Sequence, residues 1–330
     1  MKAIVYHNYG SPDVLKCVEI EKPAAADNEV LIRVRAASVN PLDWHFMRGM
    51  PYFVRILTGL RKPKATQLGF DVAGEVEAVG RNVTQFKPGD EVFGASRGAF
   101  AEYACTSESA LAMKPDNVTF EQAASVCVAA LTALQGLRDK GKIQSGQKVL
   151  INGAAGGVGT FAVQIAKWFG ADVAGVCSTK NVDMVRSIGA DRIIDYTQED
   201  FTRSGQRYDL ILDCVGNHSL SAWRRVLNPK GIYIGVGAPS GRWMIGALAG
   251  GIVAAVLSRF TSQKLVMLLM KRSKEDLTIM HELMATGKVT PVIDKRYSLR
   301  EAADAIRYLE EGHARGKVVI TLGHDAKTTG

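Results

Sequence analysis

Residues 149–161 read VLINGAAGGVGTF, and this stretch decides the fold of the chain. The apolar run Val149–Ile151 is typical of a strand buried on both faces. Gly153, Gly156 and Gly159 follow it at three-residue spacing, and a helical pattern comes after them. Such glycines permit a tight turn, let backbone N–H groups approach a pyrophosphate, and allow close helix–strand packing. The order strand, glycines, helix therefore predicts a dinucleotide site, with a glycine-rich turn that binds nothing as the alternative.

At 330 residues the chain is too long for one ordinary hydrophobic core and suits two domains. With 47% hydrophobic and 22% charged residues, it has the composition of a globular protein. Its net charge of +8 attracts anions. The basic residues are scattered, however, and no nucleic-acid-binding module is recognisable, so we expect no nucleic-acid partner.

The five cysteines are widely spaced, odd in number and include no Cys-x-x-Cys pair. This pattern argues against a disulfide framework and a structural zinc site, and it predicts a reducing, cytoplasmic location. The most membrane-like stretch, Met244–Leu257, is shorter than the ~18–20 residues of a spanning helix. We expect a buried helix or a flap there and no membrane partner, with peripheral contact to anionic lipid as the alternative.

The pattern of the chain changes near residue 121. Before it, alternating strands such as Val30–Arg35 and turn signals such as Lys87–Asp90 predict a β-rich domain. After it, strands alternate with helices; Asp172–Ser178 is a second strand of this region, and Tyr208–Val215 is a later, very apolar one. Such alternation implies a parallel sheet with helices on both faces, so the predicted fold class is α/β.

The second strand of the predicted parallel sheet indicates which dinucleotide binds. Folds that prefer NAD usually carry Asp or Glu at the end of this strand, where it holds the ribose diol. Here the strand leads into Ser178, Thr179 and Lys180, without a carboxylate. Two hydroxyls and an ammonium can bind a 2′-phosphate, which an acid would repel. The sequence therefore favours NADPH, and the alternative is that Lys180 is an ordinary solvated charge.

This organisation resembles the medium-chain dehydrogenase/reductase superfamily. The resemblance rests on five segments that span nearly the whole chain: Ala37–Trp44, Gly69–Gly74, Ala130–Ala133, Ala155–Gly159 and Gly316–Val319. It implies a β-rich, GroES-like catalytic domain over residues 1–124 and 288–330. It also implies a Rossmann domain with a doubly wound parallel sheet over residues 125–287. A homodimer is a further implication, because members of the superfamily often join their sheets edge to edge.

Within the superfamily the chain looks like the zinc-free quinone oxidoreductase and enone reductase branch. Zinc alcohol dehydrogenases carry Cys-Gly-Ser-Asp where this chain has Asn40–Asp43, and Gly-His-Glu where it has Gly69–Asp71. Their remaining thiolate falls near Val128, and Cys127 alone cannot supply the three ligands of a catalytic zinc. We therefore expect no metal. Without a Lewis acid, dehydrogenation of an unactivated alcohol is poorly supported.

The expected activity is NADPH-dependent hydride transfer to a small-molecule acceptor, an activated alkene (an α,β-unsaturated carbonyl) or a quinone. Charge then grows on the carbonyl oxygen and must be met by placed donors. Two alternatives stay open: a metal-free alcohol or aldehyde oxidoreductase, and a non-catalytic NADPH-binding scaffold or regulator.

Three residues are candidates for the catalytic site. Asn40 replaces a metal ligand, and its amide can donate to an oxyanion, although Asn is also common in a turn before proline. Tyr52 lies where reductases of this branch often have an aromatic, so it either donates a hydrogen bond or packs. Asp43 is expected to order the local loop by hydrogen bonds.

A larger set of residues is predicted to bind the cofactor, on the glycine loop, at the carboxyl ends of strands, or by resemblance to family positions. For three of them, an ordinary structural role is the alternative: Thr132, Tyr196 and Lys317. Lys317 either reaches the cofactor phosphates or only flanks the last strand. The full set is Thr132, Gly153, Ala155, Gly156, Gly157, Val158, Gly159, Ser178, Lys180, Tyr196, Asn217, Val236 and Lys317.

Overall fold

The computed structural model describes residues 1–52, 54–236 and 262–323. The apolar stretch Met244–Leu257, for which a buried helix or flap is expected, lies outside the described residues. The chain divides into two compact units. Unit 1 comprises Met1–Val128 and Arg272–Gly330, and unit 2 comprises Ala129–Lys271.

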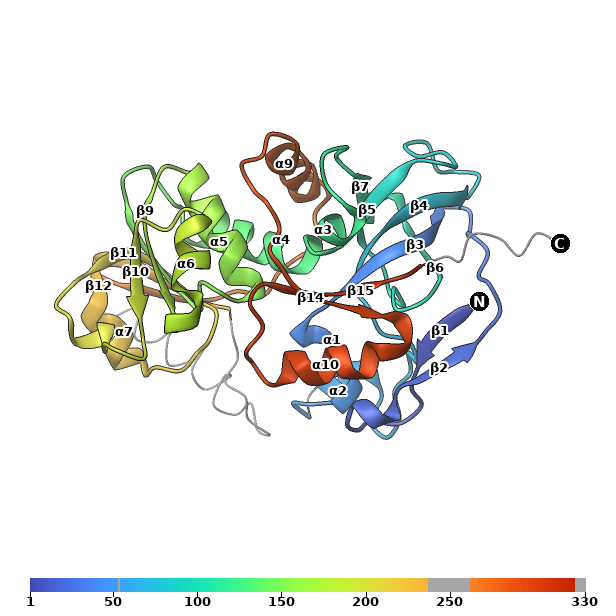
Figure 1. Ribbon diagram of the computed structural model, residues 1–330, viewed down its shortest axis with the longest axis horizontal. Coiled ribbons are helices and arrows are strands. Elements are labelled where there is room, and N and C mark those ends of the chain that lie inside the picture. Colours follow the sequence, from blue (N-terminus) through green and yellow to red (C-terminus); the bar gives the residue numbers. More distant parts are fainter. Residues whose placement is uncertain (53, 237–261, 324–330) are drawn as a thin grey trace. The chain divides into compact units, whose positions relative to one another are not determined.

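Unit 1 is built mainly from β-strands (Figure 1). A two-stranded sheet pairs β1 with β2, and a larger sheet has the order β14-β15-β3-β4-β5-β7, with β6 paired to β3. The strands are β1 (Lys2–Val5), β2 (Lys16–Glu19), β3 (Glu29–Val39), β4 (Asp71–Val79), β5 (Glu91–Ala95), β6 (Tyr103–Ser107), β7 (Leu111–Met113), β14 (Ile293–Ser298) and β15 (Lys317–Thr321). The helices that accompany them are α1 (Pro41–Arg48), α2 (Val54–Thr58), α3 (Phe120–Ala124), α9 (Lys274–Ala285) and α10 (Ala302–Glu310).

The long strand β3 organises this sheet, because it pairs with β4, β6 and β15. Its apolar residues Val30, Ile32 and Val34 are fully buried in the core of unit 1, as alternation along a strand requires. All three partners run antiparallel to β3. The β-rich, GroES-like domain expected from the sequence is confirmed.

Unit 2 contains a parallel sheet of six strands in the order β10-β9-β8-β11-β12-β13. The chain starts at the central strand β8, builds outward to β10, and then crosses over to build β11, β12 and β13. This is the doubly wound arrangement. The strands are β8 (Lys148–Asn152), β9 (Asp172–Cys177), β10 (Arg192–Asp195), β11 (Tyr208–Asp213), β12 (Leu227–Gly235) and β13 (Lys264–Met267). The helices are α5 (Gly157–Trp168), α6 (Val182–Ser187) and α7 (Leu220–Val226), and α4 (Cys127–Gln135) begins at the boundary between the units.

The core of unit 2 lies around Trp223 of α7, which is fully buried against Phe201 and Tyr233. The central strands β8 and β11 are buried along almost their whole length, since a parallel sheet is covered on both faces. The α/β class and the Rossmann-like domain expected from the sequence are confirmed. Across the described residues, none of the helices is both long and apolar enough to cross a bilayer.

The boundary between the units differs from the expected one where the chain returns from unit 2 to unit 1. Residues 272–287 were expected in the dinucleotide domain, but they belong to unit 1. The physical reason is the packing of α9 near β7: His281 Nδ1 lies 2.7 Å from the carbonyl oxygen of Met113. Asn117 also donates to the carbonyl of Met284, the penultimate residue of α9, at 3.0 Å. A helical pattern in a sequence does not state which sheet the helix covers.

Candidate active site and dinucleotide-binding loop

Strand register in unit 1 brings four polar residues together at one end of the sheet. Ser38 of β3 lies opposite Asp71, the first residue of β4. Val39 lies opposite Val318 of β15, so the adjacent residues Asn40 and Lys317 also come together. We call Ser38, Asn40, Asp71 and Lys317 the Lys317 cluster.

Asp71 is the acceptor at the centre of this cluster. Its carboxylate is fully buried, and Oδ2 accepts hydrogen bonds from Ser38 Oγ at 2.7 Å and from Asn40 Nδ2 at 3.0 Å. Lys317 Nζ lies 3.4 Å from the same oxygen, while Oδ1 accepts from the Val128 N–H at 2.9 Å. A buried charge requires such pairing and hydrogen bonding, because its desolvation is costly. The cluster therefore holds one carboxylate and one ammonium in a fixed arrangement.

Lys317 is buried, with a side chain only 3% exposed. Its ammonium donates to Asn40 Oδ1 at 2.6 Å and to Asp71 Oδ2 at 3.4 Å. The amide of Asn40 is oriented by this contact, since Nδ2 then faces Asp71 and the carbonyl of Ser38, 3.3 Å away. Both amide N–H groups of Asn40 therefore have acceptors inside the cluster. An ammonium has three donors, and these two contacts account for two of them.

Asp43 lies on the first turn of α1 and is fully buried. Its Oδ2 accepts from the N–H of Asn40 at 2.8 Å, and its Oδ1 accepts from the N–H of Gly69 at 2.9 Å. Burial raises the pKa of Asp43 from 3.8 to about 7, against the lowering effect of these two hydrogen bonds. With both oxygens bound to backbone N–H groups, Asp43 orders the loop that carries Asn40.

Gly69 makes this arrangement possible. Its φ is +98°, a conformation that other residues rarely adopt, and a Cβ there would lie 2.6 Å from the Phe100 nitrogen. The segment can thus turn its N–H toward Asp43 just before β4 begins.

Tyr52 follows the 41–48 helix by four residues and is 39% exposed. The guanidinium of Arg55 lies over its ring, 5.1 Å from the centroid, and Arg55 also covers Tyr9. Tyr9 in turn contacts the hydroxyl of Thr58 at 2.7 Å. The ring of Tyr52 therefore lies at the surface of unit 1, where Arg55 packs on it and on Tyr9.

In unit 2 the predicted turn connects β8 to α5. Gly153 has a φ of +79°, and a Cβ there would lie 2.7 Å from Val215 Cγ2. A Cβ on Gly159 would lie 2.0 Å from the carbonyl oxygen of Gly153, so only glycine fits inside this turn. Gly156 is different, since a Cβ would meet only the same oxygen, at an ordinary 3.4 Å. No contact within the described chain therefore requires glycine at position 156. Close approach of a bound pyrophosphate would explain why a glycine is present there.

The remaining loop residues surround the start of α5. Ala155 is buried, and Gly157 and Val158 are the first two residues of the helix. Because the first N–H groups of a helix have no intrahelical acceptor, this end favours an anion. The residues present therefore fit the pyrophosphate of a dinucleotide.

The residues predicted near a 2′-phosphate come together at the ends of β9 and β10. Cys177 and Asp195 lie opposite one another in the parallel register, so Ser178 and Lys180 follow one strand end while Tyr196 follows the other. Tyr196 is 58% exposed. Asp195 was missed by sequence reasoning: it comes from the neighbouring strand, and its Oδ2 accepts from Thr179 Oγ1 at 2.5 Å.

Asn217 lies at the carboxyl ends of β8 and β11, where Asn152 Nδ2 donates to it at 3.0 Å. Asn152 also donates to the buried Asp213, which accepts the N–H groups of Val215 and Gly216 as well. These hydrogen bonds fix the conformation of the loop that follows β11. Val215 of this loop lies beside Gly153. The apolar pattern of β11 gave no sign of this role for Asp213, because the pattern identifies a buried strand and says nothing of the polar residue that ends it.

Val236 directly follows β12, and its N–H donates to the carbonyl of Asp213 at 2.9 Å. Gly237, the next residue of the predicted nicotinamide loop, lies outside the described residues. Thr132 lies within α4 and is 6% exposed.

Asp71 and Ser38 were also missed as site residues. A usable signal was present, because Asp71 and Lys317 are each the one charged residue in their segment, and both segments are among the five that carry the family resemblance. Over the described ranges, no three side chains of His, Cys, Asp or Glu gather as ligands around a metal would. Cys127 is buried, which raises the pKa of its thiol well above 9.0.

Comparison with known families matches residues 26–116 to the alcohol dehydrogenase GroES-like domain and residues 188–320 to the zinc-binding dehydrogenase family. The "chloroplast envelope quinone oxidoreductase homolog" of Arabidopsis thaliana is 34% identical, over 97% of this chain and 98% of its own length. The chain belongs to the medium-chain dehydrogenase/reductase superfamily, in its quinone oxidoreductase branch. A second Arabidopsis thaliana relative, "NADPH-dependent alkenal/one oxidoreductase, chloroplastic", is also 34% identical, over 97% of this chain and 79% of its own length.

Solved structures agree with this assignment. The quinone oxidoreductase of Coxiella burnetii has a TM-score of 0.85 and 32% identity, and the match covers 98% of this chain and 99% of that one. The Escherichia coli quinone oxidoreductase complexed with NADPH has a TM-score of 0.82 and 25% identity, over 97% and 100% of the two chains. A structure described as an NAD-dependent alcohol dehydrogenase has a TM-score of 0.86 and 29% identity, over 98% and 100%.

The cytoplasmic location expected from the cysteines is wrong. Relatives of the chain are named as chloroplast-envelope, chloroplastic or mitochondrial proteins. Widely spaced cysteines indicate a reducing environment, but that condition is not specific to one compartment.

Proposed function

We propose that this protein is an NADPH-dependent oxidoreductase that transfers hydride to the activated alkene of an α,β-unsaturated carbonyl compound or to a quinone. The observation that carries the proposal is the buried Lys317 ammonium, held by Asn40 and Asp71 in unit 1. The names of its relatives, an alkenal/one oxidoreductase and quinone oxidoreductases, support the same reaction.

NADPH supplies the hydride, and we assign its pyrophosphate to the glycine loop 153–159 and its 2′-phosphate to Ser178, Lys180 and Tyr196. When a hydride adds to the β-carbon of an enone, negative charge develops on the carbonyl oxygen. The third N–H of Lys317 is the donor that we assign to this oxygen. A fixed ammonium of this kind stabilises developing charge strongly, because it needs no reorganisation during the reaction. A solvent proton then completes the saturated product.

The other cluster residues act through Lys317. Asp71 and Asn40 fix the direction of its ammonium, and Ser38 and the Val128 N–H hold Asp71. Asp43 positions the loop of Asn40. Asn40 itself is a positioning residue in this proposal, since its two amide N–H groups are already used.

We further propose that the reaction needs no zinc. The support is chemical: the position that would need a positive charge beside Asp71 already holds the Lys317 ammonium. A second cation there would meet repulsion from this group.

A homodimer is also proposed. Its support is β13, the last strand in the sheet order within the described part of unit 2. Met267 ends this strand and is 45% exposed, and Leu269 follows it and is 86% exposed. Exposed apolar side chains at a strand that has no further partner among the described strands favour pairing with a second copy. Molar mass in solution, measured by light scattering, tests this.

The experiment that tests the function follows NADPH oxidation by absorbance against a panel of enones, quinones, aldehydes and alcohols, with and without a chelator. Turnover of enones or quinones that resists the chelator supports the proposal. Alcohol oxidation that the chelator abolishes would overturn it. NADPH binding without turnover of any acceptor would overturn the catalytic part and leave only the binding site.

A further inference from the structure

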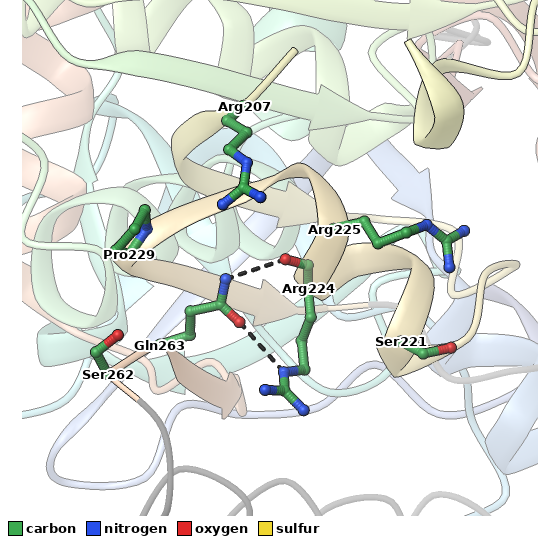
Figure 2. A pocket seen from close by; sticks show the side chains of 7 residues that line it. All are labelled: Arg207, Ser221, Arg224, Arg225, Pro229, Ser262 and Gln263. Carbon is green, nitrogen blue, oxygen red and sulfur yellow. Dashed lines mark hydrogen bonds between the residues drawn. The ribbon is translucent and has the colours of Figure 1, made fainter. Parts of the chain in front are cut away.

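Unit 2 has a concave surface away from the glycine loop, with a volume of about 500 Å³. It is lined by residues from the segment before β11, from α7, from the start of β12 and from the segment before β13. These are Arg207, Ser221, Arg224, Arg225, Pro229, Ser262 and Gln263 (Figure 2). Three of the seven are arginines, two carry hydroxyls, and none is acidic.

Gln263 fixes the position of Arg224. This glutamine is 8% exposed, and its Nε2 donates to the carbonyl oxygens of Arg224, at 3.0 Å, and Leu227, at 2.8 Å. These two bonds orient the amide, so Oε1 accepts from Arg224 Nε at 3.2 Å. Because only Nε is used in this contact, the terminal N–H groups of Arg224 keep their capacity to bind an anion. Figure 2 shows the guanidinium groups of Arg207 and Arg224 on either side of this amide.

The positive charge of this surface is not balanced by neighbouring acids. Within the described ranges, none of Arg207, Arg224 and Arg225 forms an ion pair. Asp209 follows Arg207 by two residues, but its carboxylate accepts from the N–H of Lys148 and from the amide of Asn228. Arg224 and Arg225 are in the last turn of α7, where cations are favoured, but Arg207 comes from another segment. The favourable effect of the helix end therefore does not account for the presence of the Arg207 guanidinium.

The location separates this surface from the dinucleotide site. Arg207 precedes β11, and Gln263 precedes β13, so the surface lies at the amino ends of the parallel strands. The glycine loop follows β8 and therefore lies at the opposite, carboxyl edge.

The geometry points to a binding site for a small, soluble anion that carries a diphosphate group. Guanidinium groups pair with phosphate oxygens through two parallel N–H donors, and the fixed fork of Arg224 suits this contact. Arg207 supplies a second cation, and the hydroxyls of Ser221 and Ser262 can donate to remaining oxygens. The lining offers no apolar side chain larger than Pro229 for an acyl tail, which favours a free diphosphate over a lipid headgroup.

The test uses the full chain saturated with NADPH and inorganic pyrophosphate as the probe, with binding measured by calorimetry. We expect one pyrophosphate per chain, and about ten-fold weaker binding in the variant Arg207→Gln/Arg224→Gln. The matched control is Arg186→Gln, an exposed arginine on α6, which should bind pyrophosphate as the unmodified chain does. Turnover with NADPH should be the same in all three proteins, which separates this site from the proposed activity.

Three outcomes would overturn the proposal. The first is equal binding by the double variant and the Arg186→Gln control. The second is that pyrophosphate binds only without NADPH, because the probe would then occupy the dinucleotide site. The third is no pyrophosphate binding, but sedimentation with phosphatidylcholine vesicles that contain phosphatidic acid and loss of that sedimentation in the double variant; the ligand would then be a lipid surface.

Discussion

The ammonium of Lys317 donates to Oδ1 of Asn40 at 2.6 Å, across 277 residues of sequence. This bond connects the first residue of β15 to the residue that caps α1. It also determines which way the Asn40 amide faces, because the oxygen must meet the ammonium. The relationship assigns the donor for the substrate to Lys317 and the positioning role to Asn40.

Removing the ammonium should therefore reduce turnover. In Lys317→Gln/Asp71→Asn both charges are removed together, so no unpaired charge stays buried and the fold should be retained. We expect kcat for an enone or quinone to fall by about 100-fold, a typical result for loss of one oxyanion donor. The dissociation constant of NADPH, measured by fluorescence, should not change, because the residues assigned to it lie in unit 2.

The single variant Lys317→Gln leaves Asp71 buried without its counter-charge and should lower the free energy of unfolding by about 3–5 kcal/mol. The control is Lys288→Gln, an exposed lysine of unit 1, which should have unchanged kcat. A folded double variant with full turnover would remove Lys317 from the mechanism.

The buried carboxyl of Asp43 should make the stability of unit 1 depend on pH. Its pKa is raised from 3.8 to about 7, so the folded state holds this proton more tightly than the unfolded state. Between these two values the free energy of unfolding contributed by Asp43 falls as pH rises, by up to about 4 kcal/mol. Urea unfolding of Asp43→Asn should lack this decrease between about pH 4 and pH 7. An identical pH dependence in both proteins would contradict the assignment.

Two glycines of the same loop should respond differently to alanine. In Gly156→Ala the new Cβ meets only an ordinary contact, so the melting temperature should hold while NADPH binds at least about ten-fold more weakly. In Gly159→Ala the Cβ would lie 2.0 Å from a backbone oxygen, so the fold itself should lose about 2 kcal/mol or more. Calorimetric melting and NADPH titration of both variants distinguish the two roles. Unchanged NADPH affinity in Gly156→Ala would mean that no ligand approaches this glycine.

Lys180 should distinguish NADPH from NADH. Because an ammonium interacts with the 2′-phosphate and not with a 2′-hydroxyl, Lys180→Ala should raise KM for NADPH by about ten-fold and leave KM for NADH nearly unchanged. The control is Lys148→Ala. Lys148 is an exposed lysine that begins β8, so it lies at the amino ends of the strands, whereas Lys180 follows the carboxyl end of β9. Equal effects of Lys180→Ala on both cofactors would contradict the assignment of this residue.

Asp195 lies close to the residues that we assign to the 2′-phosphate. The strand that precedes Lys180 lacks an acid, and this absence led to the prediction of NADPH. The structure places an acid beside Thr179 from the next strand. Sequence position alone could not show this, because Thr179 and Asp195 are 16 residues apart and meet only through the register of β9 and β10.

The sequence by itself determined the features that depend on neighbouring residues. An apolar run, glycines three apart and a helical pattern specify β8, its turn and α5, because strand, turn and helix form from contacts within that one stretch. The two-domain order and the family followed from five such segments.

Only the tertiary structure decided which residues act together. Asp71, Ser38 and Lys317 belong to three strands, and no local pattern states that β3 lies between β4 and β15. Likewise, α9 has an ordinary helical pattern, yet its packing near β7 places it in unit 1. The physical reason is the same in both cases: register and packing are fixed by the burial of whole faces of the sheet, and polar side chains at strand ends are brought together as a consequence.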